Sequence, residues 1–394
     1  MKKLMILGAS EPQARLTKAA KELGYYTIVV SPDGNYPGLK EGDEIFYCDI
    51  KDKEAVLEYA KSKQIDGITS CCFDIPLETI GYVNDNLNLS GLTFKSAVLA
   101  SDKFEMKRAF MDYGVSTARF KELYSKSDLE KSFNELNFPL ILKAVDLAGS
   151  QGIYVVRNEE EALKYYEDVM AATKKDYCII EEFIEGEDFG AQAFVYNGDI
   201  LFTLIHGDSV YVDHTAMPIG HYAPYILPEK VEKDAIECCE RAIRSLGLNN
   251  CGVNIDMIIK DDRVYMIELT GRAGATCLPE LVSIYYGIDY YKALAMVAVG
   301  DDPREIFQSI EKPYVPNDSM LLMSKKNGIV KSVKNTNDPD GIYELTIDVK
   351  PGDRVNKYKS SKDKIGQIVT KGVTLDAARE RLKEALENIE IIVE

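Results

Sequence analysis

The N-terminal part of the chain alternates short apolar runs with amphipathic stretches of helical period. Runs that suit strands lie at residues 4–7, 26–30 and 67–71, and stretches that suit helices lie at 13–23 and 53–63. Strands that alternate with helices are typical of a parallel sheet covered by those helices. The pattern predicts an α/β fold that opens with a parallel, doubly wound domain over residues 1–98.

The pattern changes in the middle of the chain, where strand-like runs outnumber helical stretches. Runs that suit strands lie at residues 139–144, 152–156, 177–182 and 189–196, with one helical stretch at 159–170. This succession predicts a central α+β domain over residues 99–302. Short alternating strands and a helical stretch at 375–388 then predict a small α+β C-terminal domain, residues 303–394.

Charge and composition narrow the expected partners. The 394-residue chain has a formal net charge of −17 and no cluster of Lys or Arg, so we expect no nucleic-acid partner. No stretch reaches the ~18 apolar residues that cross a bilayer. The N-terminal segment is similar to a signal peptide, but its apolar run is too short and no cleavage-like segment follows, so we expect a cytoplasmic protein without membrane contact. The 8 cysteines include no C-x-x-C pair and suit buried thiols.

Two acidic residues stand among apolar residues in a segment that suits a hairpin, residues 252–269. If the loop of this hairpin holds an odd number of residues, Asp256 and Glu268 face each other on one side, where one hard cation can bridge them. Arg272 follows Glu268 by four residues and adds an anion-binding group, which favours a metal site. The alternative is that both acids are exposed and paired with lysines.

Two other segments suit a nucleotide. Lys143 ends an apolar strand before a loop with two glycines, residues 149–152, where an ammonium group and backbone N–H groups can meet phosphates. The run 179–188 ends an apolar strand with acidic residues, whose backbone can bind an adenine edge and whose carboxylates can accept ribose hydroxyls. The alternatives are an exposed lysine and a solvated acidic turn. No G-x-x-x-x-G-K-[ST] sequence occurs, so this is not a P-loop.

The order, spacing and type of these residues resemble the ATP-grasp superfamily from about Ser101 to Gly300. The resemblance implies an ATP-grasp domain with a mobile lid at about residues 115–177. The positions that would bind ATP are Lys103, Lys143, Ser150, Gly152, Glu181, Glu182, Phe183, Ile184 and Asp188, with Glu187 as a rival for the ribose. The resemblance assigns Asp256 and Glu268 to Mg²⁺, for which Mn²⁺ can substitute.

One position departs from the superfamily pattern E-x-N-x-R, because Thr270 stands where that pattern has a metal-binding Asn. L-amino acid ligases of the same superfamily also lack this Asn and keep the arginine and a nearby glycine, here Arg272 and Gly274. The chain is therefore similar in pattern to these ligases. Residues 1–98 and the C-terminal part resemble their flanking domains.

The resemblance implies an ATP-dependent ligase that joins a small carboxylate, with an amino acid expected among the substrates, to an amine. The carboxylate would become an acylphosphate with the help of Lys143, and Arg272 would stabilise the tetrahedral intermediate when the amine attacks. ADP and phosphate would be released. Two other hypotheses stay open: a bicarbonate-activating, carboxylase-type ligase, and a non-catalytic ATP-binding protein of the same fold. A homodimer is also left open, since related ligases often dimerise.

The 3 histidines of the chain, His206, His214 and His221, lie within one short region. Their spacings fit no common zinc pattern, and no cysteine joins them. We expect a substrate-side loop in which His214 or His221 orients the carboxylate or takes a proton from the amine. The alternative is a set of ordinary surface or hydrogen-bonded histidines.

Overall fold

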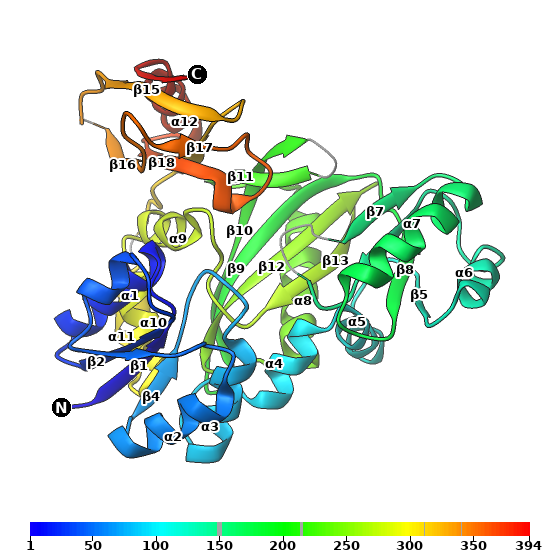
Figure 1. The fold of residues 1–394 in the computed structure, drawn as a ribbon, viewed down its shortest axis with the longest axis horizontal. Coiled ribbons are helices and arrows are strands. Elements are labelled where there is room, and N and C mark those ends of the chain that lie inside the picture. The colour runs from blue at the N-terminus through cyan, green and yellow to red at the C-terminus, as the bar shows by residue number, and fades with distance from the viewer. Residues whose placement is uncertain (148–151, 213–215, 311, 340) are drawn as a thin grey trace. The chain divides into compact units, whose positions relative to one another are not determined.

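The computed structural model describes the chain except residues 148–151, 213–215, 311 and 340. The described part folds into two compact units (Figure 1). The first contains Met1–Leu204, Leu227–Gly274 and Tyr291–Glu305, and the second contains Ile205–Ile226, Ala275–Tyr290 and Ile306–Glu394. The division expected from the sequence, at 1–98, 99–302 and 303–394, follows other boundaries and stays a prediction.

The first unit opens with the parallel, doubly wound sheet that the sequence predicted. Its strands are β1 (Lys3–Leu7), β2 (Tyr26–Ser31), β3 (Glu44–Tyr47) and β4 (Gly67–Thr69), in the order β3-β2-β1-β4. The linking helices are α1 (Glu11–Glu22), η1 (Pro37–Lys40) and α2 (Lys53–Lys63), and α3 (Leu77–Leu87) follows β4. The strand order reverses between β1 and β4, and sheets of this kind place ligands beside the carboxyl ends of such strands.

A small antiparallel sheet comes next in the same unit. Its strands are β5 (Phe120–Leu123), β6 (Leu140–Ala144), β7 (Ile153–Val156) and β8 (Cys178–Glu182), in the order β5-β8-β6-β7. Helices α6 (Lys126–Ser132) and α7 (Glu159–Ala172) pack on alternate residues of β6 and β8, such as Leu142 and Ile180. Because side chains alternate along a strand, Lys143 and Glu181 project from the opposite face.

The helix pair α4 (Phe94–Ser101) and α5 (Lys103–Asp112) precedes this sheet. Asp102 is the N-cap of α5, since its side chain accepts hydrogen bonds from the backbone N–H groups of Phe104 (3.0 Å) and Glu105 (3.2 Å). An acidic N-cap satisfies N–H groups that have no partner within the helix. This cap fixes the start of α5 and therefore the position of Lys103.

Three long strands complete the sheet structure of the first unit. They are β9 (Glu187–Tyr196), β12 (Cys251–Lys260) and β13 (Arg263–Thr270), in the order β13-β12-β9, and β10 (Asp199–Val212) continues from β9 into the second unit. Helix α8 (Glu229–Ser245) packs on one face, where Cys239 Sγ lies 3.6 Å from Met257 Sδ. The polar residues Asn254 and Asp256 therefore project from the other face.

The second unit is built mainly of antiparallel strands. The end of β10 pairs with β11 (Ala216–Ala223), followed by β14 (Asn317–Met323), β18 (Lys364–Lys371) and β16 (Ile342–Ile347). A smaller sheet has the order β17-β15-β19, with β15 (Gly328–Asn335), β17 (Arg354–Val355) and β19 (Ile389–Val393). The helical elements are α9 (Leu278–Tyr286), η2 (Ser361–Asp363) and α12 (Leu375–Glu387), and α10 (Tyr290–Ala298) and α11 (Arg304–Gln308) contain boundary residues between the units.

Helix length and composition bear on membrane contact. Across the described ranges of the chain, no helix is both long enough and apolar enough to span a bilayer.

Gly67 offers a test of the packing around the parallel sheet. A Cβ at this position would lie 2.1 Å from the backbone oxygen of Ala298, far inside normal contact, so the two segments would have to separate. We expect Gly67→Ala to destabilise the protein by about 2 kcal/mol or more. The matched control is Gly24→Ala, where a Cβ meets no atom within 4 Å and only the positive φ of 80° is unfavourable. Thermal unfolding measures the melting temperature of both variants. An equal fall in melting temperature in the two would contradict this packing.

Candidate active site

The hairpin of β12 and β13 places Asp256 directly opposite Glu268, as their Cα register shows. Lys260 pairs with Arg263, so the turn between the strands has two residues, Asp261 and Asp262, both with positive φ. The number of residues in the turn is therefore even, and the odd number expected from the sequence is wrong. A β-bulge supplies the missing residue.

This bulge lies between Asp256 and Met257. Met257 pairs with Met266, but Asp256 pairs with Glu268, so Ile267 has no counterpart on β12. In an unbroken register Ile267 would face Asp256, and Glu268 would project from the other side of the sheet. Bulges redirect side chains in this way beside active sites.

The acid pair is accessible and suited to a hard cation. The Glu268 side chain is 31% exposed, Asp256 is half-buried, and the residue that pairs with Asp256 on its other side, in β9, is Gly190. Gly190 has no side chain to cover the carboxylates. Directly opposed strand residues have Cβ atoms about 4.5–5.5 Å apart, which lets two carboxylates share one ion. Oxygen donors of this kind match Mg²⁺, so the residues present fit that metal.

Lys103 lies beside this acid pair. Its Nζ is 3.3 Å from Glu268 Oε2 and donates a hydrogen bond to the backbone oxygen of Leu147 (2.6 Å). Leu147 is the last described residue before the glycine-containing loop. The ammonium group therefore stands between the acid pair and the segment in which the sequence predicted phosphate contacts.

A buried ion cluster occupies the free face of β6 and β8. The Glu181 carboxylate, 1% exposed, lies 2.6 Å from Lys107 Nζ and also contacts Lys143 Nζ. Burial would raise the pKa of Glu181, but the charges of Lys107 and Lys143 and their hydrogen bonds outweigh burial and hold the pKa at about 2. Burial lowers the pKa of Lys107, and the charge of Glu181 opposes that shift. With both lysines protonated the cluster carries one net positive charge, which favours a phosphate nearby.

The remaining nucleotide positions are placed as follows. Glu182 ends β8, where its carboxylate accepts hydrogen bonds from Arg119 Nη1 (3.0 Å) and Asn137 Nδ2 (2.9 Å). Phe183 N donates to the backbone oxygen of Pro139 (2.9 Å), and Ile184 follows it. Gly152 precedes β7 with a φ of +64°, Glu187 and Asp188 begin β9, and Ser150 lies outside the described residues.

Arg272 follows β13 and forms a two-pronged ion pair with Asp74. Its Nε lies 2.7 Å from Asp74 Oδ1, and its Nη2 lies 2.9 Å from Asp74 Oδ2. Burial would raise the pKa of Asp74, but the charge of Arg272 and its hydrogen bonds lower it below the usual value. Asp74 follows β4, the strand at the switch point of the parallel sheet, so this pair fixes the guanidinium against that edge.

The second unit holds the described histidines. His206 Nδ1 and His221 Nδ1 lie 3.0 Å and 2.7 Å from the same oxygen, Asp208 Oδ1, and His221 stands directly opposite Asp208 across β10 and β11. Burial would raise the pKa of Asp208, but the charge of His221 and hydrogen bonds from both imidazoles hold it well below the usual value. His214 lies outside the described residues.

These three side chains could be considered metal ligands, since their ligand atoms lie within 4.8 Å of one another. Both distances to Asp208 are those of hydrogen bonds, and both imidazoles then donate their Nδ1–H. A metal on Nδ1 of His206 would also require a hydrogen-bond acceptor for its Nε2–H, and Nε2 is buried without such a partner in the described part of the chain. A hydrogen-bonded triad is the better description.

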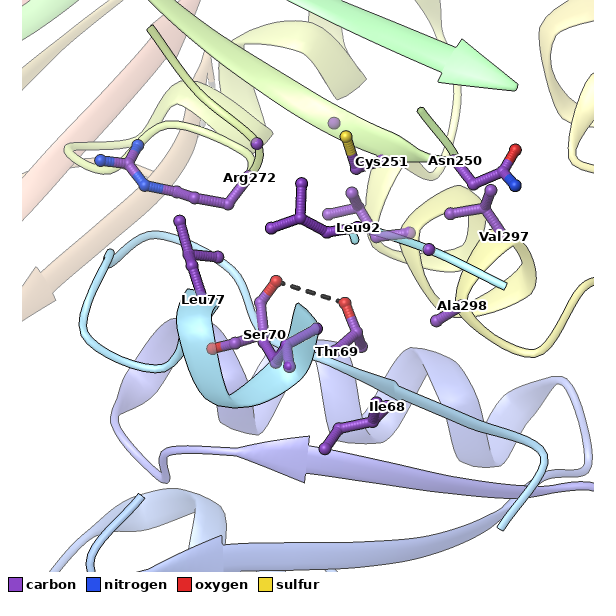
Figure 2. A pocket seen from close by; sticks show the side chains of 15 residues that line it. Ile68, Thr69, Ser70, Leu77, Leu92, Asn250, Cys251, Arg272, Val297 and Ala298 are labelled. Carbon is purple, nitrogen blue, oxygen red and sulfur yellow. Dashed lines mark hydrogen bonds between the residues drawn. The ribbon is translucent and has the colours of Figure 1, made fainter. Parts of the chain in front are cut away.

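A small cavity lies between β4, α3 and the start of β12 (Figure 2). Figure 2 shows Arg272 extending past Leu77, away from Asn250 and Val297 at the other end of the cavity. The cavity encloses about 20 Å³, room for about one water molecule. It is too small to be a nucleotide or substrate pocket.

Four polar residues beside these groups were not singled out from the sequence: Lys107, Asp74, Gln192 and Asn254. The position of Lys107, one helical turn after Lys103, could have indicated it from the sequence. The position of Asp74, an acid just beyond a strand of the parallel sheet, is a weaker indication. Gln192 and Asn254 become adjacent only through the register of β9 and β12.

Two family models match this chain. The phosphoribosylglycinamide synthetase ATP-grasp (A) domain matches residues 100–272, and the L-amino acid ligase C-terminal domain 2 matches residues 320–394. The solved structure of phosphoribosylglycinamide synthetase from Anaerococcus prevotii is 42% identical, covers 100% of both chains and has a TM-score of 0.87.

Two more distant proteins are similar over most of the chain. The alanine–anticapsin ligase of Bacillus subtilis (strain 168) is 26% identical over 363 residues, which is 81% of this chain and 76% of that protein. The L-amino acid ligase structure from Bacillus licheniformis has a TM-score of 0.84 at 19% identity, covers 100% of this chain and 99% of its own, and shares the fold.

The chain belongs to the ATP-grasp carboxylate–amine ligases. It is an ATP-dependent ligase, and the resemblance to this superfamily and to its L-amino acid ligases is confirmed. The family as a whole uses ATP and Mg²⁺, and one related structure, a biotin carboxylase domain, contains MgADP.

Glu181 offers a test of the buried ion cluster. Glu181→Gln leaves Lys107 and Lys143 buried without their counter-charge, so we expect a loss of about 3 kcal/mol of stability at neutral pH. The control is Glu135→Gln, which removes an exposed partner of Lys121 and should change stability by less than about 1 kcal/mol. Thermal unfolding of the two variants measures the difference, and equal melting temperatures would contradict the role of the cluster.

The stability difference between wild type and Glu181→Gln should depend on pH. The folded-state pKa of Glu181 is lowered from 4.5 to about 2, so its stabilising contribution is complete above about pH 4.5 and is lost as the pH falls toward 2. The gap in melting temperature between wild type and Glu181→Gln should therefore narrow as the pH is lowered from 6 to 3. A gap that stays constant over this range would show that the carboxylate does not act through its charge.

Proposed function

We propose that this ligase uses ATP to phosphorylate the carboxylate of an amino acid and then joins that acyl group to an amine, releasing ADP and phosphate. The observation that carries the proposal is the opposed acid pair Asp256 and Glu268 with the ammonium group of Lys103 3.3 Å from Glu268. A metal-binding acid pair next to a lysine suits the transfer of a phosphoryl group, in which negative charge must be offset.

The names of the relatives support an amino acid as the acid substrate. Alanine–anticapsin ligase and phosphoribosylamine–glycine ligase are both named for an amino acid that they join to another molecule. The second is 22% identical over 253 residues, 60% of this chain. The match of residues 320–394 to a domain of L-amino acid ligases supports the same substrate class.

We assign Lys103 and Lys143 to the phosphates of ATP, together with Ser150 and Gly152 of the adjoining loop. The backbone from Glu181 to Ile184 would bind adenine, and Asp188, or Glu187 in its place, would bind the ribose. The Glu181 carboxylate is engaged by two lysines, so its main contribution is to hold Lys143 in position.

Mg²⁺, or Mn²⁺ in its place, would be held by Asp256 and Glu268 and would supply positive charge to the transferring phosphoryl group. Lys103 contacts Glu268 in this structure. With a cation held there, the ammonium group of Lys103 would no longer be required to neutralise Glu268 and would be available to contact the phosphates. Glu268 would in this way have a positively charged partner both with and without the cation.

Arg272 would stabilise the negatively charged oxygen that forms when the amine attacks the acylphosphate. Asp74 accepts one N–H of Nε and one of Nη2, and the backbone oxygen of Ala273 accepts one of Nη1 (3.3 Å), so the second N–H of Nη1 and that of Nη2 are the donors that would face a substrate. Gly274, two residues on, would line the same site. Acylphosphates hydrolyse in water, so we also propose that residues 115–177 act as a lid.

His221 and His214 remain proposed substrate-side residues. Asp208 holds His221 by Nδ1, which leaves Nε2 as the atom that would contact a substrate.

Hydroxylamine trapping tests the proposal without knowledge of the amine. The protein would be incubated with Mg·ATP, one amino acid at a time, and hydroxylamine, whose nitrogen attacks the acylphosphate and displaces phosphate to give a hydroxamate. We expect hydroxamate and equal ADP with at least one amino acid. ADP formed only with bicarbonate would favour a carboxylase-type ligase instead.

Glu268→Gln tests the metal assignment within this assay. The amide removes one negative charge while keeping the shape of the side chain, so we expect the rate of hydroxamate formation to fall roughly 100-fold. Glu58→Gln, at an exposed position on α2, is the control and should keep the wild-type rate. Wild-type activity in Glu268→Gln would remove the basis of the proposal.

A further inference from the structure

A chain of three hydrogen bonds links the loop after β13 to Asp256. Gly274 N donates to Gln192 Oε1 (2.9 Å), Gln192 Nε2 donates to Asn254 Oδ1 (2.7 Å), and Asn254 Nδ2 donates to Asp256 Oδ1 (3.2 Å). Gln192 is directly opposite Asn254 in the pairing of β9 with β12, and Asn254 shares one strand face with Asp256.

The two ends of this series of hydrogen bonds fix its direction. A backbone N–H can only donate, and an ionised carboxylate can only accept. The amides of Gln192 and Asn254 each accept at one end and donate at the other, so turning either by 180° would set two donors or two acceptors against each other. Gln192 is fully buried, so water cannot repair such a mismatch.

We propose that Gln192 and Asn254 are positioning residues that hold the Asp256 carboxylate in its cation-binding orientation and connect it to the segment that carries Arg272. The inference rests on the proposed function, because it takes Asp256 and Glu268 as the cation ligands. Both amides would act through Asp256 and not on the cation or the reacting atoms themselves.

Strand geometry explains why such support is needed. Asp256 lies at the β-bulge, where the ladder of β12 and β13 is interrupted, and its other neighbour, Gly190, has no side chain to steady it. The hydrogen bond that Asn254 donates orients the Asp256 carboxylate at this point. Hydrogen-bonded partners that orient a metal ligand are typically worth a factor of about 10 to 100 in metal affinity.

Gln192→Glu would reverse the direction of the hydrogen bonds between position 192 and Asp256. A carboxylate at position 192 still accepts from Gly274 N but cannot donate to Asn254, so Asn254 turns its amide group to donate to position 192. Its oxygen then faces Asp256 in place of a donor. We expect Mn²⁺ affinity, measured by electron paramagnetic resonance with a non-hydrolysable ATP analogue present, to weaken at least about 10-fold. Nucleotide affinity in the presence of a chelator should stay at the wild-type value.

Two further variants complete the experiment. Gln192→Met has nearly the same shape but no polar atoms, and it should weaken Mn²⁺ binding as well. Gln367→Glu is the matched control, because Gln367 is also a buried glutamine, 7% exposed, that donates to Glu344 (2.6 Å) in the second unit. It should leave Mn²⁺ affinity unchanged. Circular dichroism would establish that each variant is folded.

Glu268→Gln separates failure of this inference from failure of the proposed function. If Glu268→Gln weakens Mn²⁺ binding and both folded Gln192 variants bind Mn²⁺ like the wild type, the positioning role is wrong and the proposed metal site stands. If Glu268→Gln itself binds Mn²⁺ normally, both are wrong. Weakened Mn²⁺ binding in all three variants, with metal-free nucleotide affinity unchanged in the Gln192 variants, supports the inference.

Discussion

The repulsion between Asp256 and Glu268 is the constraint around which the first unit is organised. Two carboxylates on directly opposed residues cannot both stay ionised at low cost unless positive charge lies near them. The structure provides that charge in Lys103, 3.3 Å from Glu268, and the residue that pairs with Asp256 on β9 is Gly190, which has no side chain. A hairpin selected only for stability would place opposite charges or apolar residues at these positions. The acid pair is therefore consistent with the proposed role of binding a cation.

Charge balance extends from this pair through the neighbouring elements. Glu181 neutralises one of the two buried lysines on the face of β6 and β8, which leaves a net positive site, and Asp74 fixes Arg272 through two hydrogen bonds. Each of these buried charges has at least one partner, as burial in low dielectric requires. Arg272, Lys107 and Lys143 are thus held in place by protein partners, which suits the proposed stabilisation of developing charge by fixed groups.

Much of this could be predicted from the sequence. The alternating pattern was enough for the parallel sheet. The acids of the hairpin, Lys143 and Arg272 were singled out from residue type and spacing, and Lys103 from the resemblance to the ATP-grasp superfamily. The bulge was not predictable, because the hydrophobic pattern of β13 does not reveal an extra residue. The extra residue was therefore expected in the turn. Asp74 and Gln192 were missed for a different reason: their partners are distant in sequence, and only the tertiary fold joins them.

The most direct test of the central claim is a crystal structure with Mn²⁺ and ADP, in which the anomalous signal of manganese locates the ion. The account predicts a peak between Asp256 and Glu268, roughly 2.1 Å from a carboxylate oxygen of each. A peak bound elsewhere, or an ion held by the nucleotide alone with both carboxylates turned away, would contradict it.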